Sequence, residues 1–157
     1  VITQARAEAI PARMYPAISA EDCLIADLGY DPGRGWQSYE ARDRFLHARA
    51  IDASAGLILW QIAVIGDHDF SRLDADAEAL ALLGQILEED YPRDHQVIVY
   101  QAATLVMSAP SIQVLALKNL GQAHVTQAST LFVPPAYRPR VAPERLAKLQ
   151  ALAAPAD

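Results

Sequence analysis

Polar residues stand where three apolar runs of the sequence begin or end, and that placement can hold a ligand. They are Gln61 after one run, Tyr100 and Gln101 at the same stage of the next, and Ser129 with Thr130 at the start of the last. In α/β sheets, ligands bind outside the carboxyl ends of strands, where side chains and free backbone groups project into a crevice. Each residue also has a simpler interpretation, because buried polar groups usually hydrogen-bond locally. The pattern predicts a site but names no ligand.

A further candidate is Ser19, which precedes a short acidic helix. Glu21 and Asp22 follow in the first turn, where carboxylates suit the positive end of the helix dipole. A serine at this position caps a helix, and the free amide groups of the first turn can face a ligand. Ser19 therefore joins the candidate residues.

The segment after this helix is predicted to be a turn. Gly29, Gly33 and Gly35 lack the Gly-Lys-Ser/Thr ending of a phosphate loop and the spacing of a dinucleotide-binding motif. Glycine and proline in this density are typical of a turn or hinge. The run "DLGYD" is similar to the attachment loop of carrier proteins, but Pro32 follows Asp31 where a serine would hold the prosthetic group. That interpretation fails.

The other reactive side chains form no known catalytic arrangement. His68 lies between two carboxylates in "GDHDF", but adjacent loop residues rarely converge on one metal ion without distant ligands, so a solvated loop is favoured. Cys23 lies in the middle of a helix and is predicted to be a buried, inert thiol. His95 and His124 stand alone and are expected at the surface or at strand ends. No nucleophile elbow surrounds Ser19 or Ser129.

Composition narrows the function classes. The 157 residues are 52% hydrophobic and 20% charged, with a formal net charge of -6, which is typical of a globular protein and unfavourable for binding nucleic acid or anionic lipid. The single cysteine excludes a disulfide framework and favours a reducing, cytoplasmic setting. No apolar run approaches the roughly 20 residues of a membrane span. Because the sequence starts at Val1 inside a helix-like segment, we expect it to be the back part of a longer protein.

Short apolar runs alternate with longer runs of three-to-four-residue spacing, which predicts an α/β fold. Buried strands are expected over 56–66, 95–103 and 129–135, and a weaker strand over 12–16. Residues 36–46 are expected to form an edge strand or a strand that runs into a helix.

Three helices are expected in the second part of the chain. The clearest covers 74–92, with Asp74 as its cap and Leu80, Leu83 and Leu87 on one face. A second covers 109–121 and ends at Gly121 as a C-terminal cap, and a third covers 142–152. The turn near residues 29–37 is expected to separate two regions.

The order of these segments resembles the tetrapyrrole-methylase superfamily, and within it the borosin-type peptide backbone α-N-methyltransferases. The runs "ISAEDCL", "LILWQ" and "STLFVPP" carry the resemblance to that branch. It implies a two-domain α/β methylase that binds S-adenosylmethionine between its domains, methylates a precursor peptide and forms an intertwined homodimer. It also implies which residues contact the methyl donor: Ser19, Ala20, Gln61, Tyr100, Gln101, Ala102, Ser129 and Thr130. Ala17, in the same loop as Ser19, replaces a glycine that is common in the family.

The resemblance covers only part of the family's length. Residues 1–34 correspond to the end of the N-terminal donor-binding domain, and 35–157 to a complete C-terminal mixed-sheet α/β domain. The family's Gly-rich donor loop and its amide-activating tyrosines and arginine have no counterpart here, so no catalytic residue is predicted. We expect the full-length protein to be a methyltransferase and this chain alone to be inactive. Two alternatives remain, a non-catalytic binding module of the same fold and a methylase of a small tetrapyrrole.

Overall fold

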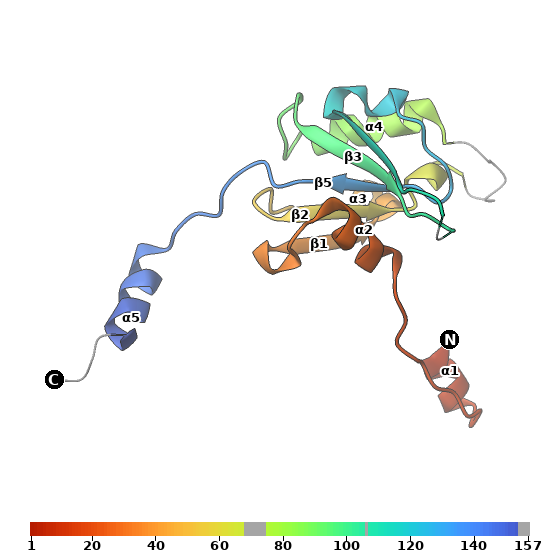
Figure 1. The fold of residues 1–157 in the computed structure, drawn as a ribbon, viewed down its shortest axis with the longest axis horizontal. Coiled ribbons are helices and arrows are strands. Elements are labelled where there is room, and N and C mark those ends of the chain that lie inside the picture. Colours follow the sequence, from red (N-terminus) through yellow and green to blue (C-terminus); the bar gives the residue numbers. More distant parts are fainter. Residues whose placement is uncertain (68–74, 106, 154–157) are drawn as a thin grey trace. The chain divides into compact units, whose positions relative to one another are not determined.

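A computed structural model describes residues 1–67, 75–105 and 107–153 (Figure 1). The chain divides into two compact units, Val1–Tyr30 and Asp31–Asp157. The first unit contains helices α1 (Ile2–Ala7) and α2 (Ala20–Leu28). Ser19 caps α2, and Gly29 ends it in a left-handed conformation with φ of 63°. The strand predicted over 12–16 does not form, since residues 11–19 have no regular secondary structure and no strand pairing.

The second unit is built on a five-stranded mixed sheet in the order β1-β2-β5-β3-β4. The strands are β1 (Trp36–Glu40), β2 (Gly56–Trp60), β3 (Gln96–Gln101), β4 (Ser111–Ala116) and β5 (Thr130–Val133). β1 pairs with β2 in parallel, and the other three pairs are antiparallel. The predicted mixed α/β fold is confirmed, although the strands are shorter than the apolar runs that predicted them.

Helices and short 3-10 turns complete this unit. They are η1 (Pro32–Arg34), α3 (Ala41–Leu46), η2 (Ile62–Val64), α4 (Ala77–Leu87), η3 (Leu117–Gln122) and α5 (Pro143–Ala153). Residues 36–46 combine the two expectations, because the edge strand β1 runs directly into α3. In the part of the chain that the structure describes, no helix has the length and apolarity to cross a bilayer.

The turn between α2 and β1 forms as predicted. Asp31 caps η1, and its carboxylate accepts a hydrogen bond of 2.9 Å from the Gly33 amide. Gly35 has φ of 115°, a value that residues with a Cβ rarely adopt. The glycines of this segment therefore serve turn geometry.

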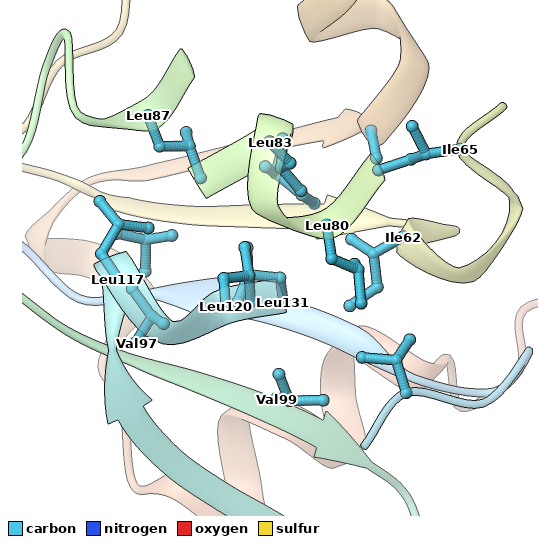
Figure 2. Close-up of a cluster of buried hydrophobic side chains, with 14 of the residues drawn as sticks. Ile62, Ile65, Leu80, Leu83, Leu87, Val97, Val99, Leu117, Leu120 and Leu131 are labelled. Atoms are coloured by element: carbon cyan, nitrogen blue, oxygen red, sulfur yellow. The ribbon is translucent and has the colours of Figure 1, made fainter. Parts of the chain in front are cut away.

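The hydrophobic core lies between the sheet and α4, which covers one sheet face (Figure 1). Figure 2 shows that Leu80, Leu83 and Leu87, the predicted apolar face of α4, point toward side chains from the strands and from η3. The other labelled members are Ile62, Ile65, Val97, Val99, Leu117, Leu120 and Leu131. Burial of each large aliphatic side chain contributes about 1.5–3 kcal/mol.

The cap of α4 differs from the prediction. Asp76 holds this position, and its carboxylate accepts hydrogen bonds from the amides of Glu78 at 2.9 Å and Ala79 at 3.3 Å. The helix begins at Ala77, so an N-cap must lie at residue 76, while Asp74 lies outside the described residues.

The helix predicted over 109–121 is wrong. This segment forms β4 and η3, and six residue pairs join β4 to β3, from Gln96 with Ala116 to Gln101 with Ser111. The β-branched residues Ile112 and Val114 alternate with other residues along β4, and pairing with β3 decides between the two periodicities.

Gly121 is not the predicted C-terminal cap, because it lies inside η3. Its role is in packing. A Cβ at this position would come within 2.9 Å of the carbonyl oxygen of Ala77 and within 2.9 Å of the Cβ of Ala81. Glycine therefore lets η3 approach α4 closely.

Replacement of Gly121 by alanine is expected to reduce the free energy of unfolding by about 1–3 kcal/mol, because the added methyl group overpacks the contact between η3 and α4. Urea denaturation measures the change. Gln85→Ala, an exposed substitution on α4, serves as the control and is expected to change stability by less than about 0.5 kcal/mol. Equal stabilities of the two variants would contradict this packing argument.

Candidate functional site

Pairing of three strands places the predicted polar residues at one edge of the sheet. Strands β2 and β3 end at this edge, and β5 begins there because it is antiparallel to both. The register pairs Leu59 of β2 with Leu131, and Tyr100 of β3 with Thr130. Gln61 directly follows β2, and Ser129 directly precedes β5. The residues predicted for the second unit thus belong to separate chain segments but lie at one edge of the sheet.

These residues divide between the two sheet faces, because successive side chains of a strand point to opposite sides. Val99 and Leu131 belong to the core beneath α4, so Gln101 shares that face. Tyr100 and Thr130 are buried on the opposite face, with exposed fractions of 1% and 5%. Polar groups therefore lie on both faces of the sheet at this edge.

A hydrogen-bond network at this edge centres on Thr126, which sequence reasoning missed. The Thr126 hydroxyl donates to Oε1 of Gln101 at 2.8 Å. The Thr126 amide donates to the hydroxyl of Ser129 at 2.9 Å, and the Ser129 amide donates back to the Thr126 carbonyl at 2.9 Å. Threonine and serine three residues apart are typical of hydroxyl-capped turns, and this spacing was the available sequence signal.

Gln61 adopts a left-handed backbone conformation, with φ of 59° and ψ of 36°. Its carbonyl accepts a hydrogen bond from the Val64 amide at 3.2 Å, which starts η2, and its side chain is exposed. For residues with a Cβ this conformation costs roughly 1–2 kcal/mol, and such strain concentrates at ligand sites. Ala102, which directly follows β3, is half-buried.

Ser19 and Ala20 belong to the first unit, where they begin α2. Ser19 and Asp22 form a capping box: the Ser19 amide and hydroxyl each donate to the Asp22 carboxylate at 2.7 Å, and the Asp22 amide donates to the Ser19 hydroxyl at 3.1 Å. The predicted cap is confirmed. These bonds, the backbone bond first, hold the pKa of the Asp22 carboxyl below its ordinary value of 3.8.

Cys23 differs from its prediction as a buried thiol. It is half-buried, and with Ala17 and Ile18 it lines a shallow hollow in the first unit. The fully buried residue of α2 is its neighbour Leu24, and adjacent residues of a helix point in different directions.

His95 has a structural role, whereas the side chain of His124 has none within the part of the chain that the structure describes. Nε2 of His95 donates to the carbonyl of Pro134 at 2.8 Å, and its ring stacks on Tyr91 just before β3. His124 is exposed, as predicted. His68 and most of the loop predicted around it lie outside the described residues, and Asp67, before it, is buried. Among the residues described, no group of three or more His, Cys, Asp and Glu can hold a metal ion.

Comparison with known proteins identifies relatives along most of this sequence. No family model matches it. It is 40% identical over 139 residues to the methyltransferase and ribosomally synthesized cyclic peptide precursor for gymnopeptides of Gymnopus fusipes. It is 39% identical over 153 residues to a type III borosin precursor of Anomoporia bombycina, and 33% identical over 139 residues to the omphalotin A precursor of Omphalotus olearius.

The chain matches a segment of the borosin methyltransferases. The matches cover 85%, 94% and 85% of this chain, but 33%, 18% and 33% of the relatives. The chain therefore spans about a third or less of the length of these borosin relatives. The resemblance to the borosin branch predicted from the sequence is confirmed.

Solved structures show the same fold. Uroporphyrin-III-C-methyltransferase from Thermus thermophilus superposes with a TM-score of 0.58 at 17% identity, over 85% of this chain and 56% of that chain. Cobalt precorrin-4 methyltransferase superposes with a TM-score of 0.58 at 12% identity, over 87% of this chain and 57% of that chain. The predicted tetrapyrrole-methylase-like fold is confirmed for this chain.

Replacement of Gln61 by glycine is expected to raise the free energy of unfolding by up to about 1 kcal/mol, because glycine adopts positive φ without strain. Thermal or urea unfolding measures the change. The opposite substitution, Gly66→Ala at φ of 77° with no atoms near its would-be Cβ, is expected to lower stability by about 1 kcal/mol. A Gln61→Gly protein less stable than the wild type would show that the side chain outweighs backbone strain.

The Asp22 carboxyl is expected to titrate below 3.8. Because its folded pKa is lowered, its stabilising contribution is present above the ordinary pKa and is lost as the pH falls through the folded value. Ser19→Ala is expected to move the pKa part of the way back, since the backbone bond remains.

Carboxyl carbon shifts in NMR spectra measure the pKa of Asp22. Ser54→Ala is the matched control, because the Ser54 hydroxyl bonds Asp52 at 2.6 Å and is the largest cause of that carboxyl's lowered pKa. It should raise the pKa of Asp52 and leave Asp22 unchanged. An unchanged Asp22 pKa in Ser19→Ala would rule out the Ser19 hydroxyl bond as a cause of the lowered pKa.

Proposed function

We propose that the full-length protein is an S-adenosylmethionine-dependent methyltransferase that methylates backbone amide nitrogens of a precursor peptide. The observation that carries this proposal is identity of 33–40% to proteins whose names join a methyltransferase to a ribosomally synthesized cyclic peptide precursor. One structural neighbour, a uroporphyrin-III methyltransferase with a TM-score of 0.55, was solved with the demethylated donor product bound. That neighbour supports the fold as one that holds the donor.

The donor is proposed to bind at the edge where β2 and β3 end and β5 begins. Gln61, Tyr100, Gln101, Ala102, Ser129 and Thr130 of the second unit are assigned to it. For Ser19 and Ala20 of the first unit, donor contact rests on the family resemblance alone. The edge fits such a ligand, since it combines a strained backbone at Gln61 with hydroxyl and amide side chains at Ser129 and Gln101.

The chemistry divides between donor and protein. S-adenosylmethionine supplies an electrophilic methyl group, and the protein must hold the acceptor nitrogen in line with it. An amide nitrogen is a weak nucleophile, so it must be deprotonated or its carbonyl must be polarised. We assign donor positioning to this chain and amide activation to residues outside these 157, so no catalytic residue is proposed here.

The domain and assembly assignments are part of the same proposal. Residues 1–34 are assigned to the end of the N-terminal donor-binding domain and 35–157 to the C-terminal α/β domain. The turn formed by η1 and Gly35 supports a boundary there. A homodimer in the cytoplasm is proposed, and the single free cysteine suits a reducing compartment.

Calorimetric titration of the full-length protein with S-adenosylhomocysteine tests donor binding, and mass spectrometry of the precursor peptide tests methylation. We expect a dissociation constant below about 1 mM and an increase in mass on backbone amides of the peptide. Ser129→Ala is expected to weaken binding about tenfold, because a hydrogen-bonding hydroxyl at the edge is lost. Ser54→Ala, at a half-buried position in the loop before β2, is the control.

The 157-residue chain should give no methylated peptide under the same conditions. Turnover by this chain would overturn the division of labour between donor positioning and amide activation. Absence of donor binding to the full-length protein would overturn the proposed function.

A further inference from the structure

Thr126 joins two residues assigned to the donor site although it lies outside both strands. Its hydroxyl oxygen is 2.8 Å from Oε1 of Gln101 and 3.3 Å from the hydroxyl of Ser129. Gln101 ends β3 and Ser129 precedes β5, so the threonine bridges the ends of two neighbouring strands.

The hydrogen bonds of the Thr126 hydroxyl give this bridge a direction. The hydroxyl accepts a hydrogen bond of 3.3 Å from the Ala128 amide and donates its own hydrogen to Oε1 of Gln101. The nitrogen of the Gln101 side-chain amide is then the end turned away from Thr126. The hydroxyl of Ser129 meanwhile accepts from the Thr126 amide and lies 3.3 Å from the Thr126 hydroxyl.

We propose that Thr126 is a positioning residue of the donor site, which holds the Gln101 amide so that its NH₂ group faces the ligand beside the Ser129 hydroxyl. The edge on the α4 face would therefore present hydrogen-bond donors. It would select acceptor atoms of the ligand, such as carboxylate oxygens or purine ring nitrogens. This inference rests on the proposed function and states that one part of its site offers hydrogen-bond donors to the ligand.

A purely structural role for the Thr126 side chain predicts a different result. The turn itself is held by the Ser129 amide on the Thr126 carbonyl at 2.9 Å and by the Thr126 amide on the Ser129 hydroxyl at 2.9 Å. Neither of these two bonds uses the Thr126 hydroxyl, although the weaker turn bond from the Ala128 amide at 3.3 Å does. Thr126→Val keeps the side-chain shape and the two shorter turn bonds, loses the bond to Ala128 and releases Gln101, whereas Thr126→Ser keeps all of them.

The test uses the full-length protein and S-adenosylhomocysteine as the calorimetric probe, with circular dichroism to verify folding. Thr126→Val is expected to weaken binding about tenfold, and Thr126→Ser, which keeps the hydroxyl, to stay within about twofold of the wild type. In the methylation assay, Thr126→Val should raise KM for the donor with kcat nearly unchanged, as expected when ground-state and transition-state binding are lost equally.

Gln101→Glu tests the polarity directly. Its carboxylate still accepts from Thr126 but replaces the NH₂ group with an acceptor, so binding is expected to weaken by about tenfold or more. If Thr126→Val does not fold, this variant with Thr126→Ser decides the matter.

The outcomes separate the two proposals. A wild-type protein that does not bind the probe overturns the proposed function and this inference together. A wild type that binds, with unchanged affinity in Thr126→Val or in Gln101→Glu, overturns the positioning role of Thr126 and leaves the proposed function standing.

Discussion

Antiparallel pairing of β5 between β2 and β3 is the constraint on which the second unit depends. The strand order shows that β5 alone joins the parallel pair β1-β2 to the antiparallel pair β3-β4. All four of its residues are buried, and they serve both sheet faces, since Leu131 and Val133 enter the core beneath α4. Its direction also brings Ser129 to the ends of β2 and β3. The same hydrogen-bonded ladder therefore holds the sheet together and assembles the proposed donor edge.

Sequence patterns predict the structure correctly where interactions between residues close together in the sequence decide it. The spacing of Leu80, Leu83 and Leu87 predicted the buried face of α4, and the serine before two acidic residues predicted the capping box of α2. The segment over 109–121 was misassigned because its apolar residues suit either a helix or a strand. Pairing with β3 decides the outcome, and that partner is not visible in the segment itself. Gly121 was misread for the same reason, since its role is contact with a helix about forty residues earlier.

The candidate edge was predictable in part. Polar residues at the ends of apolar runs are recognisable in sequence, because strands end where burial ends. Thr126 was not recognised, since its hydroxyl bonds a residue 25 positions away, and only the order of strands brings the two together. The left-handed conformation of Gln61 was equally hidden, because glutamine has no preference for positive φ and the surrounding fold imposes it.

The core and the candidate site share strands. Because side chains alternate between the two faces of the sheet, the residues that enter the core also decide which residues reach each face at the strand ends. Val99 packs beneath α4, Tyr100 faces the other side, and Gln101 returns to the α4 face at the strand end. A shift of β3 by one residue against β5 would carry each of these side chains to the opposite face. It would also separate Gln101 from Thr126, leaving polar groups at the edge without the partners that offset their desolvation. The core register therefore enforces the geometry of the edge, and the apolar contacts around Leu131 that stabilise the sheet also fix which polar groups meet there.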